Sequence, residues 1–214
     1  MSWANVLFGR EKLFGGGRME IILIVASYLF GSISPARLLA KIKGVDLMSK
    51  GTQNPGATNV YKLIGTGWGV TIAFMDLFKG MIPAAIARIY LDVNPLILIL
   101  TGVGVVAGHN WPIFYSFKGG RGLATSLGVF CILNFKLILF TFIISLAISA
   151  YLKKKYGERI RIPFSLYPLM MLANIFFVKN WFLLVYTVIL MAIALFRAWQ
   201  VRHKLKDKKA KIEK

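Results

Sequence analysis

Two polar segments of this 214-residue sequence carry residue types that could bind phosphate. The first, residues 44–62, contains the run Gly51-Thr52-Gln53-Asn54-Pro55-Gly56-Ala57-Thr58-Asn59. The second is Phe117-Lys118-Gly119-Gly120-Arg121-Gly122, which leads into an apolar run. Segments rich in Gly, Thr and Asn let several backbone N–H groups point at one oxyanion, and nearby Lys and Arg add positive charge. The pattern favours a phosphate site, and the alternative is two turns at a membrane surface that contact lipid headgroups.

A third feature is a pair of ionisable residues inside an apolar run. Asp76 and Lys79 are three residues apart, so on a helix they share one face. Charged groups in such a run are energetically costly, and they mark either a functional site or an internal pair that joins helices. The sequence alone leaves both interpretations open. His109, near the end of the next apolar run, is expected to order the end of its helix rather than to act as a base.

The remaining chemistry-bearing residues indicate no metal site. The two histidines, His109 and His203, are far apart, and the eight carboxylates form no paired motif. Phosphoryl transfer through a carboxylate-held Mg²⁺ is therefore not expected, and we predict no cofactor. Cys131 is the only cysteine, which excludes a disulfide within the chain.

The amino-acid composition of the chain predicts which secondary-structure elements position these residues. Hydrophobic residues make up 57% of the chain and charged residues 16%, and the mean hydropathy is +0.66. Soluble domains average about 45–50% apolar and about 25% charged residues, and disordered chains are less hydrophobic still. We therefore predict an all-α integral membrane protein. Gly31-Ser32-Ile33-Ser34-Pro35 should break or kink its first helix through Gly and Pro.

Apolar runs predict about seven transmembrane helices, since a span needs roughly 20 residues. The fourth run is the shortest, and it would be a short helix or a re-entrant segment. Gly104 and Gly108, four residues apart in the third run, should allow close contact between helices. The predicted runs are residues 21–36, 70–87, 96–117, 122–135, 137–152, 162–178 and 181–196.

Basic residues predict the orientation of these helices. With seven spans, 20 of the 27 Lys and Arg fall on one side, in the segments 37–62, 118–121, 153–161 and 197–214. The positive-inside rule places this side in the cytoplasm, with the N-terminus outside and the C-terminus inside. Most of the net charge of +19 then reports topology and headgroup attraction, and no nucleic-acid partner is expected. Residues 1–18 are interpreted as a tail or as a mis-assigned start before Met19, residues 19–200 as the membrane domain, and residues 201–214 as a basic cytoplasmic tail.

Several motifs together resemble the bacterial membrane acyl-phosphate:glycerol-3-phosphate acyltransferase family. They span about half of the chain in the order and spacing of that family. The combination of the Asn-Pro-Gly-Ala-Thr-Asn run with the Phe-Lys-Gly-Gly turn is the most specific part of the match. The matching motifs are Gly31-Ser32-Ile33, Asn54 to Val60, Asp76-Leu77-Phe78-Lys79-Gly80, Gly108-His109 with Pro112, and Phe117 to Gly122.

The resemblance implies a seven-helix enzyme in the bacterial inner membrane with a site that faces the cytoplasm. It would transfer a fatty acyl group from acyl-phosphate to glycerol-3-phosphate and make lysophosphatidic acid, the first step of phospholipid synthesis. Acyl-phosphate is already activated, so positioning and cations could suffice without a covalent nucleophile. The acyl chain would lie between helices. By this resemblance, the substrate-phosphate-binding residues are Ser32, Thr52, Asn54, Gly56, Asn59, Lys62, Lys118, Gly119, Gly120 and Arg121, and the catalytic residues are Ser165 and His203.

The chain also departs from the family pattern. Lys62 and Arg121 stand where the family usually has Arg and Lys, and the two are not equivalent at a bidentate phosphate contact. Gln53 replaces a usual Gly. The family typically ends its last helix with Arg-His-x-x-Asn. One register aligns Arg202-His203 with this motif and puts Lys206 at the Asn, whereas the other aligns Arg197 with it and puts Ala198 and Val201 at the His and Asn.

These C-terminal departures motivate an alternative function. A degenerate relative could bind or transport phosphorylated lipids without catalysing acyl transfer. This alternative predicts binding of the substrates without turnover.

Overall fold

The computed structural model describes residues 17–156, 169 and 172–212, and every regular element within them is helical. Among the described residues, four helical stretches are long and apolar enough to cross a membrane by length and composition, and some of them join two elements: Arg18–Ile42, Thr66–Ile89, Pro95–Tyr115 and Trp181–Val201. Leu123–Leu133 and Phe135–Ile148 are shorter apolar helices. Most of the sixth predicted run, residues 162–178, lies outside the described residues. The count of seven transmembrane helices therefore stays a prediction.

The first apolar run is broken where the sequence predicts a break. Helix α2 (Gly17–Ser32) ends before Ile33, and α3 (Pro35–Ile42) begins after Ser34. The Ser34 hydroxyl accepts a hydrogen bond from the Arg37 amide at 3.4 Å and so caps α3. Pro35 occupies the first position of this helix, where a backbone donor is not needed.

The remaining elements begin and end at recognisable residues. Asn94 caps α6 by accepting from the Ile97 amide at 2.9 Å, and Pro83 lies inside α5 shortly before a π-helical turn. These elements are α4 (Ala57–Leu63), α5 (Thr66–Ala85), η1 (Ile86–Tyr90), α6 (Pro95–Asn110), η2 (Ile113–Tyr115), α7 (Leu123–Leu133), α8 (Phe135–Tyr156), η4 (Asn174–Val178) and α10 (Trp181–Ile212).

Glycines let two pairs of helices approach closely. Helix α2 packs along α6, where a Cβ on Gly104 would meet Ser27 and Ile24, and one on Gly108 would meet the Tyr28 carbonyl. This contact confirms the packing predicted from the spacing of Gly104 and Gly108. Helix α5 packs along α7 in the same manner, since Gly80 and Gly128 each face backbone of the opposite helix.

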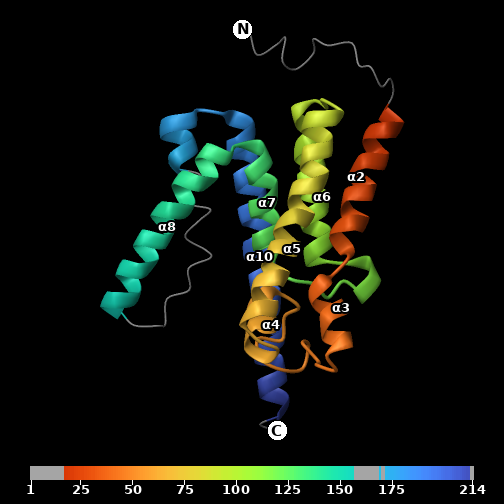
Figure 1. The fold of residues 1–214 in the computed structure, drawn as a ribbon, viewed down its shortest axis with the longest axis vertical. Helices are drawn as coiled ribbons and strands as arrows, with labels where there is room; N and C mark the ends of the chain where they lie inside the picture. The colour runs from red at the N-terminus through yellow and green to blue at the C-terminus, as the bar shows by residue number, and fades with distance from the viewer. Residues whose placement is uncertain (1–16, 157–168, 170–171, 213–214) are drawn as a thin grey trace.

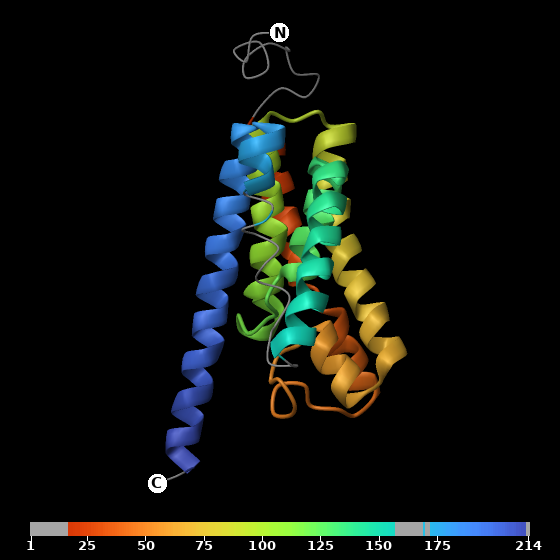
Figure 2. The same cartoon turned by 90° about the vertical axis from the view of Figure 1, so that its left-hand side faces the viewer.

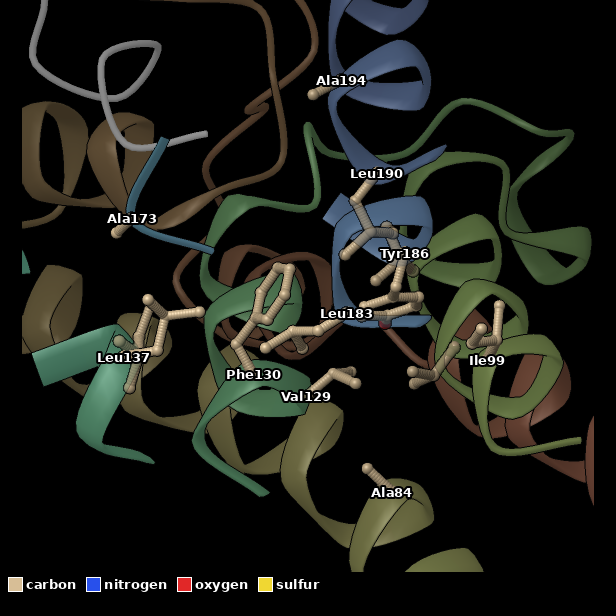
Figure 3. Packing of buried hydrophobic residues seen from close by; sticks show 13 residues of the cluster. Ala84, Ile99, Val129, Phe130, Leu137, Ala173, Leu183, Tyr186, Leu190 and Ala194 are labelled. Carbon is tan, nitrogen blue, oxygen red and sulfur yellow. The ribbon is translucent and has the colours of Figure 1, made fainter. Parts of the chain in front are cut away.

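A hydrophobic core joins α6, α7 and α10. The rings of Phe130 and Tyr186 meet edge to face with centroids 5.2 Å apart, and Val129 and Leu190 pack beside them (Figure 3). All four residues are buried. In contrast, α8 carries exposed Leu139, Phe140, Ile143 and Leu146, as expected for a surface in contact with lipid.

The polar segments gather at one end of the helical bundle. Helix α2 begins at the opposite end, and α10 runs along the bundle toward the polar end (Figures 1 and 2). The α3–α4 connection and the α6–α7 connection both lie there, beside the C-terminal half of α10. Residues 201–212, predicted as a tail, continue α10 as helix. This arrangement brings segments distant in sequence to a common site.

Candidate functional site

A cavity of about 550 Å³ lies where these segments meet. It contains the predicted site residues Asn54, Lys118, Gly119 and His203, which come from three separate parts of the chain. The exposed Lys118 and His203 side chains make its wall accessible from the polar end. Its other lining residues are Met48, Gln53, Trp111, Phe117, Arg197, Trp199, Gln200 and Val201.

The Gly119–Gly120 turn is held tightly against the end of α6. Gly119 donates its N–H to the Asn110 carbonyl at 3.2 Å, and Gly120 donates to the His109 carbonyl at 3.0 Å. These two amides are thus engaged within the protein, whereas the sequence pattern predicts that they bind phosphate. A Cβ on Gly120 would collide with the His109 ring, and one on Gly119 would collide with the His109 carbonyl. Glycine is therefore required here for close approach as well.

Arg197 of α10 fixes the outer side of the same turn. Its Nε donates to the Gly120 carbonyl at 3.1 Å, and its Nη2 donates to the Gly119 carbonyl at 2.8 Å. The side chain is buried. Arg197 is absent from the predicted site residues, although a charged residue directly after the last apolar run was a signal for it. Of the two registers for the family motif, the one through Arg197 brings its arginine to the Gly-Gly turn.

Arg37 of α3 holds the adjacent residue and was also missed. Its Nη2 donates to the Lys118 carbonyl at 2.5 Å, and its guanidinium lies 4.8 Å from the centre of the Tyr115 ring. The signal in the sequence was a single charge that interrupts the first apolar run. Two arginines from distant helices thus bind consecutive carbonyls of residues 118–120.

Ser32 lies beneath the α6–α7 connection and is fully buried. Its hydroxyl donates to the Tyr28 carbonyl at 2.9 Å and accepts from the Ile113 amide at 3.4 Å. Tyr28 in turn donates its hydroxyl to the Trp111 carbonyl at 2.8 Å. These contacts attach the connection to α2, and Ser32 is not among the residues that line the cavity.

Asn59 organises the first polar segment. Its Oδ1 accepts from the Thr52 amide at 2.7 Å, and its Nδ2 donates to the carbonyls of Leu47 and Lys50 at 2.9 and 3.2 Å. Asn59 has no exposed surface. Its amide is therefore occupied by backbone partners, which shape the segment that leads to Asn54.

The other predicted residues of this segment lie around Asn59. Gly56 precedes the first residue of α4, and Thr52 is partly buried. Lys62, in the last turn of α4, is exposed and does not line the cavity. Asn54 reaches the cavity, and its Oδ1 is buried without a hydrogen-bond partner among the residues that the structure describes.

Asp76, Lys79 and His109 form a buried cluster directly behind the Gly119–Gly120 turn. Lys79 Nζ lies 3.3 Å from Asp76 Oδ1 and 3.0 Å from His109 Nδ1, and it donates to the Ile33 carbonyl at 2.9 Å. His109 Nδ1 is 3.4 Å from Asp76 Oδ1. The sharing of one helical face by Asp76 and Lys79 is confirmed. The cluster joins α5 to α6 and to the break after α2, so its geometry fits the internal-pair interpretation.

A second cavity of about 470 Å³ lies on the other side of Met48. Arg37, Lys41, Asp46 and Tyr115 are among its lining residues. The carboxylate of Asp46 accepts from the backbone amides of Met48 and Ser49. The bond from the Met48 amide, followed by that with the Ser49 side chain, holds the pKa of Asp46 below its usual value. Asp46 is therefore ionised at neutral pH and partly offsets the positive charge of this second cavity.

Two predicted residues remain. Arg121 is partly buried just before α7, next to Gly122, whose φ of +73° is a left-handed conformation. Ser165 lies outside the described residues. Within the part of the chain that the structure describes, no group of three His, Cys, Asp or Glu side chains could hold a metal ion.

The fold and the cavity define a multi-pass helical membrane protein with a cation-lined site at one end of its bundle. Residues 21–210 match the glycerol-3-phosphate acyltransferase family, and the chain belongs to this family. The sequence resemblance to that family is thereby confirmed.

Individual relatives agree with this assignment. A glycerol-3-phosphate acyltransferase of Aquifex aeolicus (strain VF5) is 43% identical over 64% of this chain and 70% of its own length. The enzyme of Geotalea daltonii is 46% identical over 52% of this chain and 57% of its own length. The crystal structure of PlsY (YgiH), an integral membrane glycerol 3-phosphate acyltransferase, in its glycerol 3-phosphate form has a TM-score of 0.76 and 33% identity, and the match covers 89% of this chain and 93% of that one. Its lysophosphatidic acid form matches with a TM-score of 0.73.

Proposed function

We propose that this protein transfers a fatty acyl group from acyl-phosphate to glycerol-3-phosphate and releases lysophosphatidic acid and phosphate. The observation that carries this proposal is the structural match, over 89% of the chain, to an acyltransferase crystallised in glycerol 3-phosphate and lysophosphatidic acid forms. The cavity supports it, because Lys118 and His203 line a space large enough for a small phosphorylated substrate.

In this reaction a hydroxyl of glycerol-3-phosphate attacks the acyl carbonyl carbon. The new ester C–O bond forms, the bond from the acyl carbon to the phosphate oxygen breaks, and inorganic phosphate leaves with that electron pair. In the cavity wall, Lys118 would neutralise charge on the phosphates and His203 would accept the hydroxyl proton. Arg121, which does not line the cavity, takes its proposed phosphate role from the family resemblance. Asn54 lines the same cavity, whereas the proposed phosphate contacts of Thr52 and Lys62, which do not line it, rest on the family resemblance. The catalytic role of Ser165 rests on the family resemblance.

We further propose that the polar end of the bundle faces the cytoplasm of a bacterial cell, with the protein in the inner membrane. The cavity lies at the end that carries Arg37, Lys41, Lys43, Lys50 and Lys62. Lys and Arg accumulate on the cytoplasmic side of membrane proteins. Both substrates would then reach the cavity from the side on which soluble metabolites are made, and the acyl chain would extend between the helices.

The test is acyl transfer by the purified full-length protein in lipid vesicles. Labelled glycerol-3-phosphate should be converted to labelled lysophosphatidic acid with acyl-phosphate as donor and not with acyl-CoA. Lys118→Met should lower the rate, because it removes a cation from the cavity wall at similar side-chain volume. Lys136→Met, in α8 away from this cavity, is the matched control and should retain the wild-type rate. Binding of both substrates without product would reject catalysis and favour the lipid-binding alternative.

A further inference from the structure

Gln200 occupies an unusual position in the cavity wall. It lies on α10, one helical turn after Arg197, and lines the cavity together with Lys118 and His203. Its Oε1 accepts two hydrogen bonds, one from Trp111 Nε1 and one from Arg197 Nη1, each 3.0 Å long. The carbonyl half of this side chain is therefore fixed from two directions.

These two contacts determine which way the Gln200 amide points. Indole N–H and guanidinium groups are hydrogen-bond donors only, so the atom between them must be the carbonyl oxygen and not the nitrogen. The NH₂ group must therefore occupy the other branch of the amide. Neither donor can shift freely, because Arg197 also binds the Gly119 and Gly120 carbonyls and the Trp111 carbonyl accepts from Tyr28.

The NH₂ group of Gln200 has no such partner. Nε2 makes no hydrogen bond to any residue in the described part of the chain. It is also not among the buried polar atoms that lack a partner. An amide whose oxygen is locked and whose nitrogen is both accessible and unpaired offers two preorganised donors to a ligand in the cavity. Lys118 in the same wall favours an anion as that ligand.

We propose that Gln200 is a substrate-binding residue that donates a hydrogen bond from Nε2 to a phosphate oxygen in this cavity. The proposal rests on the proposed function, since it assigns the phosphate to one of the two substrates. Both acyl-phosphate and glycerol-3-phosphate carry the required group. Trp111 and Arg197 act as positioning residues, because they hold the Gln200 oxygen and thereby aim its nitrogen.

Gln200→Glu tests this role directly. The carboxylate retains an oxygen for Trp111 and Arg197 but replaces the donating NH₂ with an acceptor. We expect the KM for the substrate whose phosphate Gln200 binds to rise about 10-fold to 100-fold, the range for losing a hydrogen bond to a charged group. The Tm should stay at the wild-type value. The substrate whose KM rises identifies the source of the phosphate. If Gln200 were only a structural acceptor, Gln200→Glu would raise the KM no more than a carboxylate placed elsewhere in the same cavity wall.

Two further variants separate the hydrogen bond from other effects. Val201→Glu places a negative charge in the same cavity wall while it leaves the Gln200 amide intact. The rise in KM in Val201→Glu should be several-fold smaller than that in Gln200→Glu. Equal rises in the two variants would mean that charge repulsion alone explains the effect, and would overturn the proposal. Gln200→Met is neutral and should raise the same KM as Gln200→Glu. It should also lower the Tm, because it leaves Trp111 and Arg197 without their acceptor.

Calorimetric binding of glycerol-3-phosphate and of inorganic phosphate to the full-length protein in lipid nanodiscs distinguishes this inference from the proposed function. If the wild-type protein binds either anion and Gln200→Glu weakens that binding by about 10-fold or more, the inference stands even when no acyl transfer is observed. If the wild-type protein binds neither anion, or if wild type, Gln200→Glu and Gln200→Met bind both equally, the inference is wrong whatever the transfer assay gives.

Discussion

The two polar segments that meet at the cavity are held in different ways. Residues 44–56 are shaped mainly by one side chain nearby in sequence, since the Asn59 amide binds backbone at residues 47, 50 and 52. Residues 111–120, which include most of the second segment, bond to the end of α6 but are in addition held by side chains from distant helices. Arg37 binds the Lys118 carbonyl. Arg197 binds the carbonyls of Gly119 and Gly120, which it follows in the chain by 78 and 77 residues.

This difference assigns different tasks to the two segments. The first segment keeps its shape as long as the first turn of α4, which carries Asn59, is intact, because its contacts are close in sequence. The position of the second segment depends on α3 and α10, because arginines of both helices bind its carbonyls. A small displacement of either helix is therefore expected to move Lys118. The first segment is therefore a local scaffold, and the second couples the cavity to the packing of the bundle.

Arg197→Lys, which changes the anchor of the second segment, should give the largest loss of activity. A lysine ammonium is a compact point charge and cannot bind two carbonyls in the fork geometry of a guanidinium. The Gly119–Gly120 turn and the oxygen of Gln200 would both lose a donor. We expect kcat/KM for acyl transfer to fall about 100-fold, as for a displacement of catalytic groups by about 1 Å.

The matched control for Arg197→Lys is Arg202→Lys, the same change five positions further along α10. Arg202 is the arginine of the alternative register of the family motif. If the motif runs through Arg197, this variant should retain activity within about 2-fold of wild type. Equal losses in the two variants would remove the special role of Arg197. A larger loss of activity in Arg202→Lys than in Arg197→Lys would show that Arg202, and not Arg197, is the arginine of the family motif.

The sequence predicted features that depend on local spacing. The break at residues 31–35 follows from Gly and Pro, the contact of Asp76 with Lys79 from a separation of three residues, and the α2–α6 contact from Gly104 and Gly108. Each is a consequence of helix geometry within one apolar run, which periodicity makes visible. The position of the two polar segments at one end of the bundle was also expected, because the predicted spans place both on the same side of the membrane.

The sequence did not predict contacts between helices that are far apart in the chain. Nothing in the sequence around Arg197 indicates that its partners are two glycine carbonyls, and nothing around Lys79 indicates His109. Such pairs depend on the angle and offset at which whole helices pack, which one sequence does not encode in a readable period. For the same reason, the prediction that the Gly119 and Gly120 amides bind phosphate did not anticipate their bonds to the end of α6.

Asn59→Asp should have an intermediate effect, confined to the first segment. The carboxylate still accepts from the Thr52 amide but places an oxygen against the carbonyls of Leu47 and Lys50. We expect local destabilisation of about 1–3 kcal/mol, since a buried donor is replaced by an acceptor without a partner. Limited proteolysis should then cut within residues 44–56 faster than in wild type. Thr58→Ser, at the exposed neighbouring position, is the control, and cleavage at the wild-type rate in Asn59→Asp would contradict a scaffold role for Asn59.

Gln53→Gly should give the smallest effect, and it separates backbone strain from side-chain contacts in the same segment. Gln53 has a φ of +50°, a left-handed conformation that costs a non-glycine residue about 1–2 kcal/mol. Glycine removes that cost but loses about 0.5–1 kcal/mol through the greater freedom of the unfolded chain. The net expectation is a Tm equal to or slightly above that of wild type. Gln53→Ala keeps the strained backbone while it removes most of the side chain, so it should not raise the Tm. A fall in Tm in Gln53→Gly as large as that in Gln53→Ala would mean that the side chain of Gln53 in the cavity wall, and not the backbone conformation, determines the stability of this scaffold.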